Sequence, residues 1–115
     1  MPTKLYGIKN CDSVRKARRW LDQHNIDYVF HDLRLEGVDV ATVSRWRAAV
    51  GSDLLLNRRS TTWKQLTLSQ REAVSDSTID TLLVEMPTLI KRPVLELNGD
   101  IIVGFKDSLY DALFA

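Results

Sequence analysis

The sequence predicts an α/β fold in which helices pack against one four-stranded mixed sheet. Three observations lead to this prediction. Residues 5–33 give a strand, a helix and a second strand, a unit whose strands run parallel with a right-handed crossover. Residues 94–104 hold two apolar runs separated by Asn98-Gly99-Asp100, which is typical of a β-hairpin. A segment with helical apolar spacing follows the hairpin and predicts a closing helix.

The first half of the sheet is predicted from local patterns. Residues 5–8 are typical of a strand, and apolar residues at helical spacing predict a helix over about 12–24. Alternating residues predict a second strand over 26–33. The following residues, 34–39, are interpreted as a loop.

The middle of the chain predicts a helical block inserted over about 39–86. One helix is expected over 40–50, followed by a less regular segment over 52–63, in which residues 54–56 are expected to pack and the polar residues 57–63 to form a loop. Two short helices are expected to fill about 69–86, the first of them opened by a capping box at Ser69–Glu72.

The second half of the sheet is expected to begin at Pro93, because the first position of a strand tolerates a residue without an N–H. Strands over 94–97 and 101–104 flank the turn, and Asp107 or Ser108 is expected to cap the last helix. A βαβ half and a ββα half around one sheet, with the inserted helices to one side, form the thioredoxin-like plan.

Length and composition favour one small globular domain, so we expect residues 1–115 to form a single thioredoxin-like domain. The chain is 44% hydrophobic and 27% charged, with a net charge of +1. This balance argues against a nucleic-acid partner. We see neither a signal peptide nor an apolar run near the roughly 20 residues that span a bilayer. We therefore expect a cytoplasmic protein without a membrane partner, and a monomer.

The only cysteine, Cys11, lies where the first strand leads into the first helix. The unpaired N–H groups at a helix N-terminus favour the thiolate, which is the nucleophilic form of a thiol. A small buried, inert side chain is the alternative interpretation. The position three residues later is valine, so any disulfide formed at Cys11 must be resolved by an outside thiol such as glutathione. Four polar neighbours favour a reactive thiol over an inert one: Lys9, Asn10, Asp12 and Ser13.

Arginines in two loops are candidates for binding an anion. Arg92 precedes Pro93, and in the predicted fold it lies beside the loop that holds Cys11. A guanidinium there would stabilise a thiolate and bind a carboxylate or oxyanion. Arg59 is a second candidate, and Arg58 a weaker one. The alternative is that all three are solvated surface charges.

Several other polar side chains are expected to have no catalytic role. Arg15, Arg18 and Arg19 lie on the first helix and are expected mostly to face solvent, with a nucleic-acid or partner role as the minority alternative. His24 and His31 lack the close spacing to Cys11 that a zinc site needs, so no metal is expected.

Four ordered groups of residues carry a family resemblance: Leu5–Asp12, Leu55–Asn57 with Arg59–Trp63, Met86–Pro87 with Ile90–Pro93, and Gly104–Phe105 with Asp107–Ser108. They resemble the arsenate reductase-like family of thioredoxin-fold proteins, which also contains the Spx regulators. The resemblance spans essentially the whole chain. Within the family the chain looks closest to the YffB-type proteins, which are described as glutathione-dependent thiol reductases.

The resemblance implies one active cysteine, matched by Cys11, and a proline matched by Pro93 that is cis in thioredoxin-like folds. Arsenate reductases of the family place three arginines around the oxyanion. The last of these, in an Arg-Pro context, is matched by Arg92. The first has Asn57 at its position, with two arginines close behind. The arginine expected after the hairpin is missing, and Lys106 does not restore a planar bidentate donor.

The sequence therefore favours a monothiol thiol/disulfide reductase. We expect Cys11 to attack an unknown oxidised or disulfide substrate, with glutathione as co-substrate. Arg92, helped by Arg59, would hold the thiolate and an anionic group such as a glutathione carboxylate, beside the backbone N–H groups of residues 10–13. One alternative is a true arsenate reductase. The other is an Spx-like module that binds RNA polymerase, although Spx-type members commonly carry a C-x-x-C pair in this loop.

Overall fold

A computed structural model describes residues 2–115, which form two compact units. The first, here called the sheet unit, comprises the residues up to Asp32 together with Arg92–Ala115. The second, the helical unit, comprises Leu33–Lys91 and contains the insertion expected over about 39–86. The expectation that the whole chain is one domain stays a prediction.

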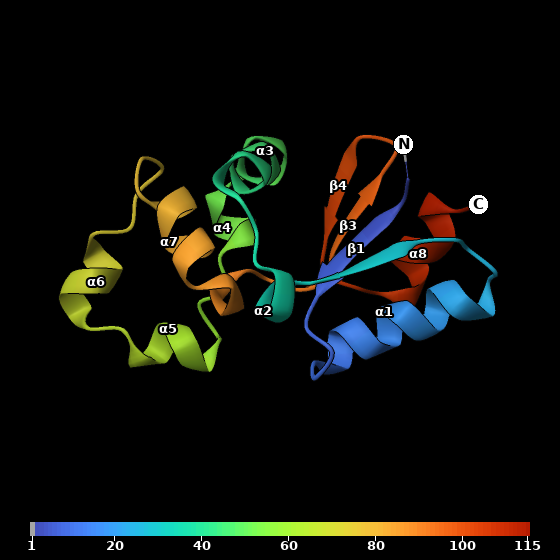
Figure 1. The fold of residues 1–115 in the computed structure, drawn as a ribbon, viewed down its shortest axis with the longest axis horizontal. Coiled ribbons are helices and arrows are strands. Elements are labelled where there is room, and N and C mark those ends of the chain that lie inside the picture. Colours follow the sequence, from blue (N-terminus) through green and yellow to red (C-terminus); the bar gives the residue numbers. More distant parts are fainter. Residues whose placement is uncertain (1) are drawn as a thin grey trace. The chain divides into compact units, whose positions relative to one another are not determined.

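The sheet unit contains a four-stranded mixed sheet with the strand order β2-β1-β3-β4 (Figure 1). The strands are β1 (Lys4–Gly7), β2 (Val29–Asp32), β3 (Val94–Leu97) and β4 (Asp100–Val103). β1 runs parallel to β2 and antiparallel to β3, and β3 runs antiparallel to β4. The predicted combination of a βαβ half and a ββα half is confirmed.

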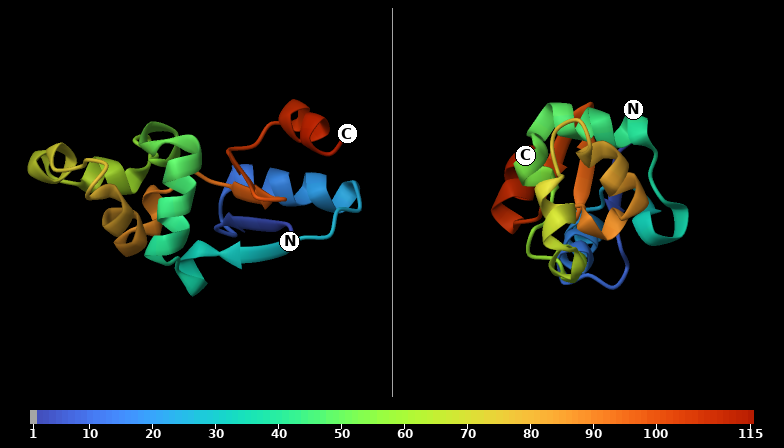
Figure 2. Two further views of the ribbon diagram at one scale, coloured as in Figure 1. Left: turned by 90° about the horizontal axis from the view of Figure 1, so that it is seen from above. Right: turned by 90° about the vertical axis from the view of Figure 1, so that its left-hand side faces the viewer.

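One face of this sheet carries the apolar core of the unit. Leu5 of β1 pairs with Phe30 of β2 and with Leu95 of β3, so these side chains point to the same face. Helices α1 (Asp12–Gln23) and α8 (Asp107–Leu113) pack on it (Figure 2). The buried residues of this cluster are Leu5, Ala17, Trp20, Leu21, Leu95 and Tyr110.

The hairpin turn has the conformation that its sequence predicts. Asn98 and Gly99 have φ angles of 51° and 88°, the left-handed region required at both centres of the favoured two-residue turn. The strands differ from expectation by one residue, because β3 begins after Pro93 and β4 begins at Asp100. Pro93 still joins the sheet edge through its carbonyl, which accepts a hydrogen bond from the Gly104 N–H at 2.8 Å.

The helical unit is built from short helices that follow one another closely. They are α2 (Leu33–Glu36), α3 (Val40–Val50), α4 (Ser52–Leu55), α5 (Thr61–Gln65), α6 (Leu68–Glu72), α7 (Ile79–Glu85) and the 3₁₀ helix η1 (Pro87–Leu89). Arg47 of α3 and Asp80 of α7 form a salt bridge at 2.8 Å, and an isolated bridge joins Leu56 to Ile90. No helix within residues 2–115 is long and apolar enough to cross a membrane.

Three predicted segments were wrong in extent. The loop expected over 34–39 contains most of α2. The less regular segment over 52–63 contains α4, and the loop expected within it over 57–63 contains the start of α5. A helix of a single turn has too few residues to show an apolar period, which explains both errors. The strand expected over 26–33 is shorter because the Ile26 N–H is bonded to the carbonyl of Leu21 at the end of α1.

Two predicted helix caps were also wrong. The capping box uses Thr67 and Gln70, whose side chains each accept from the other's backbone N–H, so the helix begins before Ser69. The N-cap of α8 is Lys106, with extended backbone, and no side-chain cap bond is made there. Asp107 is instead the first helical residue, where a carboxylate is favoured by the helix dipole.

Candidate functional site

Cys11 is the N-cap residue of α1, as predicted. Its backbone is extended, with φ −138° and ψ 126°, and its carbonyl accepts the first helical hydrogen bond from the Arg15 N–H at 2.9 Å. The side chain is half-buried and makes no capping hydrogen bond. The thiol therefore lies at the amino-terminal end of a twelve-residue helix, where the free N–H groups favour negative charge.

The start of α1 is held against the end of β1 by one close contact. A Cβ atom added to Gly7 would lie 2.6 Å from Cγ2 of Val14, closer than carbon atoms can pack. Val14 is completely buried and occupies the position that would hold a second cysteine in a C-x-x-C motif. Glycine at the end of β1 thus lets Val14 fix the first turn of α1, and with it Cys11, against the sheet.

The predicted polar neighbours of Cys11 are exposed, and Arg15 contacts two of them. Lys9 and Ser13 face solvent. Arg15 donates from Nη1 to Asp12 Oδ1 at 2.7 Å and from Nη2 to Asn10 Oδ1 at 2.6 Å. Arg15 was expected mostly to face solvent, and it is exposed, but its contacts with this loop were missed. The three-residue spacing from Asp12 on a helix is the pattern that could have indicated the contact.

Arg92 and Pro93 lie at the strand end that adjoins the Cys11 loop. Tyr6 of β1 is paired with Val94 of β3, so the residues that follow β1 leave the sheet beside those that precede β3. The Arg92–Pro93 peptide bond is cis, as the family resemblance implied. Pro93 is buried, and Arg92 is partly buried with its Nε shielded from solvent. Both residues belong to the same unit as Cys11.

Arg59 belongs to the helical unit, so its expected part in the Cys11 site stays a prediction. Its side chain is exposed, and its backbone N–H donates to Asn57 Oδ1 at 3.0 Å. Arg58 lies over the ring of Trp63, 5.7 Å from its centroid, and 3.4 Å from a carboxylate oxygen of Asp53. The weaker of the two candidates is therefore engaged within its own unit.

A pocket of about 800 Å³ lies between α1 and α8, away from the thiol. Its lining residues are Lys16, Arg19, Trp20, Gln23 and His24 on one side, and Phe105, Lys106, Asp107 and Asp111 on the other. Neither Cys11 nor Arg92 lines it. We place the candidate site at the end of α1 and not in this pocket, because the thiol of Cys11 does not line the pocket.

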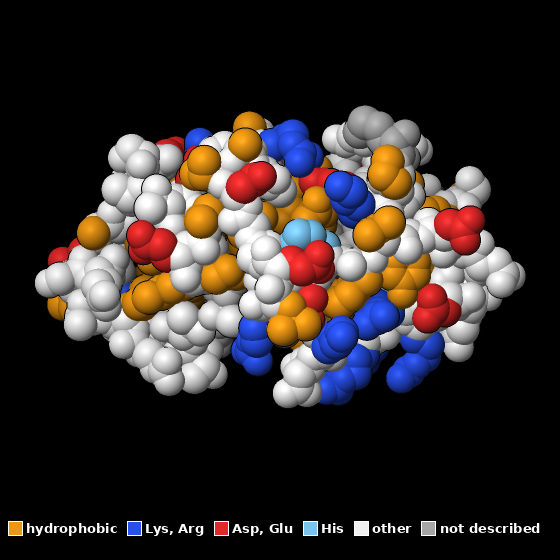
Figure 3. Space-filling model, in the orientation of Figure 1, with side chains coloured by type: hydrophobic (Ala, Val, Ile, Leu, Met, Phe, Trp, Pro, Cys, Tyr) orange, Lys and Arg blue, Asp and Glu red, His pale blue; other side chains and the backbone are white. Residues whose placement is uncertain are grey.

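Lys and Arg side chains gather over α1 (Figure 3). Arg15, Lys16 and Arg19 are exposed, whereas Arg18 lies 4.2 Å over the Phe30 ring and donates to the Tyr28 hydroxyl at 3.4 Å. The expectation that Arg18 faces solvent was therefore wrong, because its guanidinium packs on β2. Among residues 2–115, no group of three or more His, Cys, Asp or Glu side chains is arranged to hold a metal ion.

Comparisons with known proteins agree with this fold. The ArsC family matches residues 6–113. A protein named YffB has a solved structure with a TM-score of 0.94 and 43% identity, covering 98% of this chain and 99% of that one. The solution structure of an arsenate reductase (ArsC) related protein from Brucella melitensis is 45% identical, with a TM-score of 0.77 over 99% of this chain and 95% of that one. The global transcriptional regulator Spx 2 of Bacillus cereus is 28% identical over 105 residues, which are 90% of this chain and 79% of that protein.

Proposed function

The chain belongs to the ArsC family, and from this membership we propose that it is a glutathione-dependent thiol/disulfide reductase with Cys11 as its nucleophile. One observation carries the proposal. The only cysteine lies at the N-cap of α1, in a chain that is 43% identical to YffB. A thiol at a helix N-terminus is placed where its thiolate is favoured and where it can be reached by a substrate.

The chemistry is a pair of thiol–disulfide exchanges. The Cys11 thiolate attacks one sulfur of the substrate disulfide, forms a mixed disulfide and releases the other sulfur as a thiolate, which takes up a proton. A first glutathione thiolate attacks the substrate sulfur or the Cys11 sulfur, and a second completes the exchange. The sum is one substrate disulfide and two glutathione molecules giving two substrate thiols and one glutathione disulfide. Val14 excludes a dithiol route within this loop.

The flanking residues have distinct roles in this proposal. Arg92 supplies a cation for the thiolate and a planar donor for a carboxylate of glutathione, helped by Arg59. The backbone N–H groups of residues 10–13 add partial positive charge at the same end of the helix. Pro93, in its cis form, shapes the wall beside the thiol, and Lys9 adds a further exposed cation.

Two other functions use the same residues. An arsenate reductase is suggested by the similarity to the Brucella protein, and it would use Cys11 and Arg92 on an oxyanion. A regulator that binds RNA polymerase is suggested by the similarity to Spx 2, with Cys11 as a redox sensor or without a role. The reductase is favoured because the loop holds a single thiol rather than the paired cysteines common in Spx-type members.

The proposal is tested by glutathione-coupled reduction of hydroxyethyl disulfide, with NADPH and glutathione reductase reporting glutathione disulfide. We expect turnover by the native chain and none above background by Cys11→Ser. Arg92→Ala is expected to lower kcat/KM about 10-fold or more, the effect of losing one hydrogen bond to a charged group. Arg19→Ala removes an exposed charge from α1 and serves as the matched control, with unchanged turnover.

Two further measurements separate the alternatives. In the first, arsenate replaces the disulfide in the same assay. A larger kcat/KM for arsenate than for hydroxyethyl disulfide would identify an arsenate reductase. If neither substrate turns over and RNA polymerase is retained from a lysate under reducing conditions, the regulator replaces the enzyme.

A further inference from the structure

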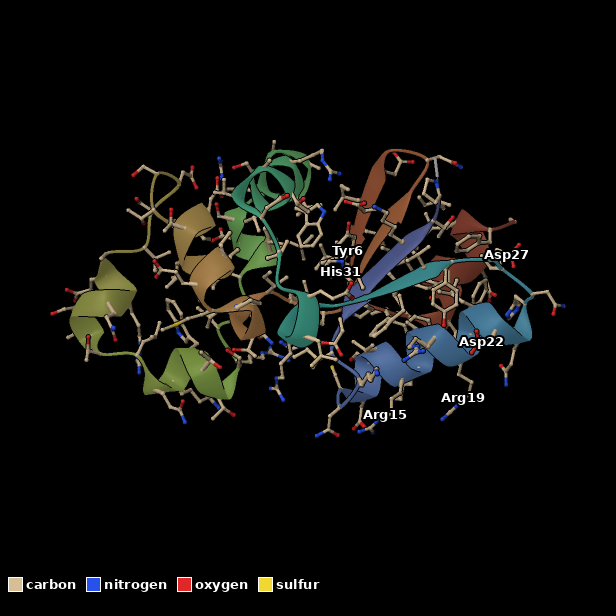
Figure 4. The ribbon with its side chains drawn as sticks, viewed as in Figure 1. Tyr6, Arg15, Arg19, Asp22, Asp27 and His31 are labelled. Atoms are coloured by element: carbon tan, nitrogen blue, oxygen red, sulfur yellow. The ribbon has the colours of Figure 1, made fainter. Side chains whose placement is uncertain are left out.

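Arg15 connects the two residues that flank Cys11 in the sequence. Its Nη1 donates to Asp12 Oδ1 at 2.7 Å, and its Nη2 donates to Asn10 Oδ1 at 2.6 Å. Its backbone N–H donates to the Cys11 carbonyl at 2.9 Å. Arg15, which is labelled on α1 in Figure 4, thus contacts each of the three consecutive residues Asn10, Cys11 and Asp12.

The loop around Cys11 has little else to hold its side chains. Asn10 and Asp12 are exposed, and among residues 2–115 no side chain other than Arg15 bonds to either of them. Cys11 itself makes no side-chain cap bond. A guanidinium is planar and presents its N–H groups in a fixed geometry, so two bonds from one Arg15 define the relative positions of two loop side chains.

The same contact places a positive charge beside the carboxylate that follows Cys11 in the chain. Asp12 directly follows Cys11, and an unpaired carboxylate there would oppose formation of the Cys11 thiolate. The Arg15 guanidinium at 2.7 Å offsets this negative charge. Arg19 lies one turn further along α1 and is exposed, and it makes no such bond.

We infer that Arg15 is a positioning residue for Cys11, acting through Asn10 and Asp12. It holds the loop that presents the thiol and compensates the charge of Asp12, and it does not itself touch the substrate. Its effect on turnover rests on the proposed function, but its effect on the reactivity of the thiol does not.

The test is the rate of Cys11 alkylation by iodoacetamide between pH 5 and pH 10, followed by intact mass. The variants are Arg15→Ala, the matched control Arg19→Ala, and Arg15→Ala combined with Asp12→Asn. Circular dichroism and thermal unfolding establish that each is folded. We expect Arg15→Ala to slow alkylation at pH 6.5 about two- to fivefold, the range for an exposed charge pair. Its rate profile shifts to higher pH and meets that of the native chain at pH 10.

The control and the double variant decide the inference. Arg19→Ala is expected to follow the native profile, and adding Asp12→Asn to Arg15→Ala is expected to recover part of the rate at pH 6.5, namely the part that depends on the charge of Asp12. Equal profiles for Arg15→Ala and Arg19→Ala, or a double variant as slow as Arg15→Ala, would overturn it. If native Cys11 reacts no faster at pH 6.5 than the thiol of free glutathione, the proposed function fails, while the comparison of variants still tests Arg15.

Discussion

The sheet unit and the helical unit are stabilised in different ways. In the sheet unit, aromatic rings close one apolar cluster, with Tyr110 meeting Trp20 edge-on at 5.5 Å and Phe105 edge-on at 4.7 Å. In the helical unit, polar side chains cap three of the short helices by accepting a backbone N–H, as Ser60 does for α5 from Trp63, and the Arg47–Asp80 salt bridge joins α3 to α7. The first unit should therefore respond most to changes of volume, and the second to changes of charge.

The largest stability effect is expected in the sheet unit at Gly7. We predict that Gly7→Ala lowers the free energy of unfolding by about 2 kcal/mol, because the new Cβ overlaps the buried Val14 side chain. Urea unfolding followed by tryptophan fluorescence measures it. Adding Val14→Ala makes room for the new atom, so the double variant should lose less than the sum of the two single losses. Simple additivity would show that the contact does not restrain α1.

A smaller effect of opposite sign is expected at Tyr110. Its hydroxyl is buried without a hydrogen-bond partner among residues 2–115, and removing such a group avoids its desolvation cost. We predict that Tyr110→Phe raises the free energy of unfolding by about 1 kcal/mol. Tyr28→Phe is the control, because the Tyr28 hydroxyl accepts a bond from Arg18 and its removal should bring no gain.

The same residue gives the sheet unit a dependence on alkaline pH. Burial raises the pKa of Tyr110 above its usual value of 10.0, so the phenol ionises first in the unfolded chain. The native chain should therefore lose stability as the pH rises above about 10. Thermal unfolding from pH 8 to pH 11 measures this loss of stability. The Tyr110→Phe variant should lose less stability over the same pH range than the native chain. Parallel curves for the two proteins would contradict a buried, neutral phenol.

The smallest effect is expected in the helical unit, at acid pH. The Arg47 hydrogen bond, aided by Ser44, holds the pKa of Asp80 below its usual 3.8. This carboxylate contributes stability that is fully present above pH 3.8 and is lost as the pH falls through the lower, folded-state pKa. Hydrogen exchange in α3 and α7 from pH 5 to pH 2.5 should show this loss. This acid-dependent loss of protection should be absent in Asp80→Asn. It should still occur in Asp53→Asn, which changes an exposed carboxylate.

The sequence predicted the sheet unit better than the helical unit, because the elements of the sheet unit follow from local sequence patterns. Alternating apolar residues, the helical spacing that starts at Val14 and the Asn98-Gly99 turn are local patterns, and each was confirmed in type. The helix α2 and the helix α4 were missed because neither is long enough to show a period. Their positions depend on contacts such as the Leu56–Ile90 bridge, which joins segments far apart in the sequence.

The residues of the candidate site also differ in how far the sequence predicted them. The place of Cys11 at the start of α1 was predicted because it depends on neighbouring residues only. The adjacency of the two strand ends that carry the Cys11 loop and Arg92 was expected from the predicted thioredoxin-like plan, and the observed strand order places β1 beside β3. Arg15 was missed because an arginine on a helix is usually solvated. Its spacing from Asp12 could have indicated one contact, whereas the contact with Asn10 depends on the conformation of the loop before α1.

The central claim is that Cys11 is the nucleophile of a reductase that uses glutathione. The most direct test compares kcat/KM for glutathione-coupled reduction of hydroxyethyl disulfide between the native chain, Cys11→Ser and Arg92→Ala. We predict turnover by the native chain, a loss of at least about 10-fold with Arg92→Ala, and none with Cys11→Ser. Turnover that survives in Cys11→Ser, or a folded native chain that shows none, would contradict the claim.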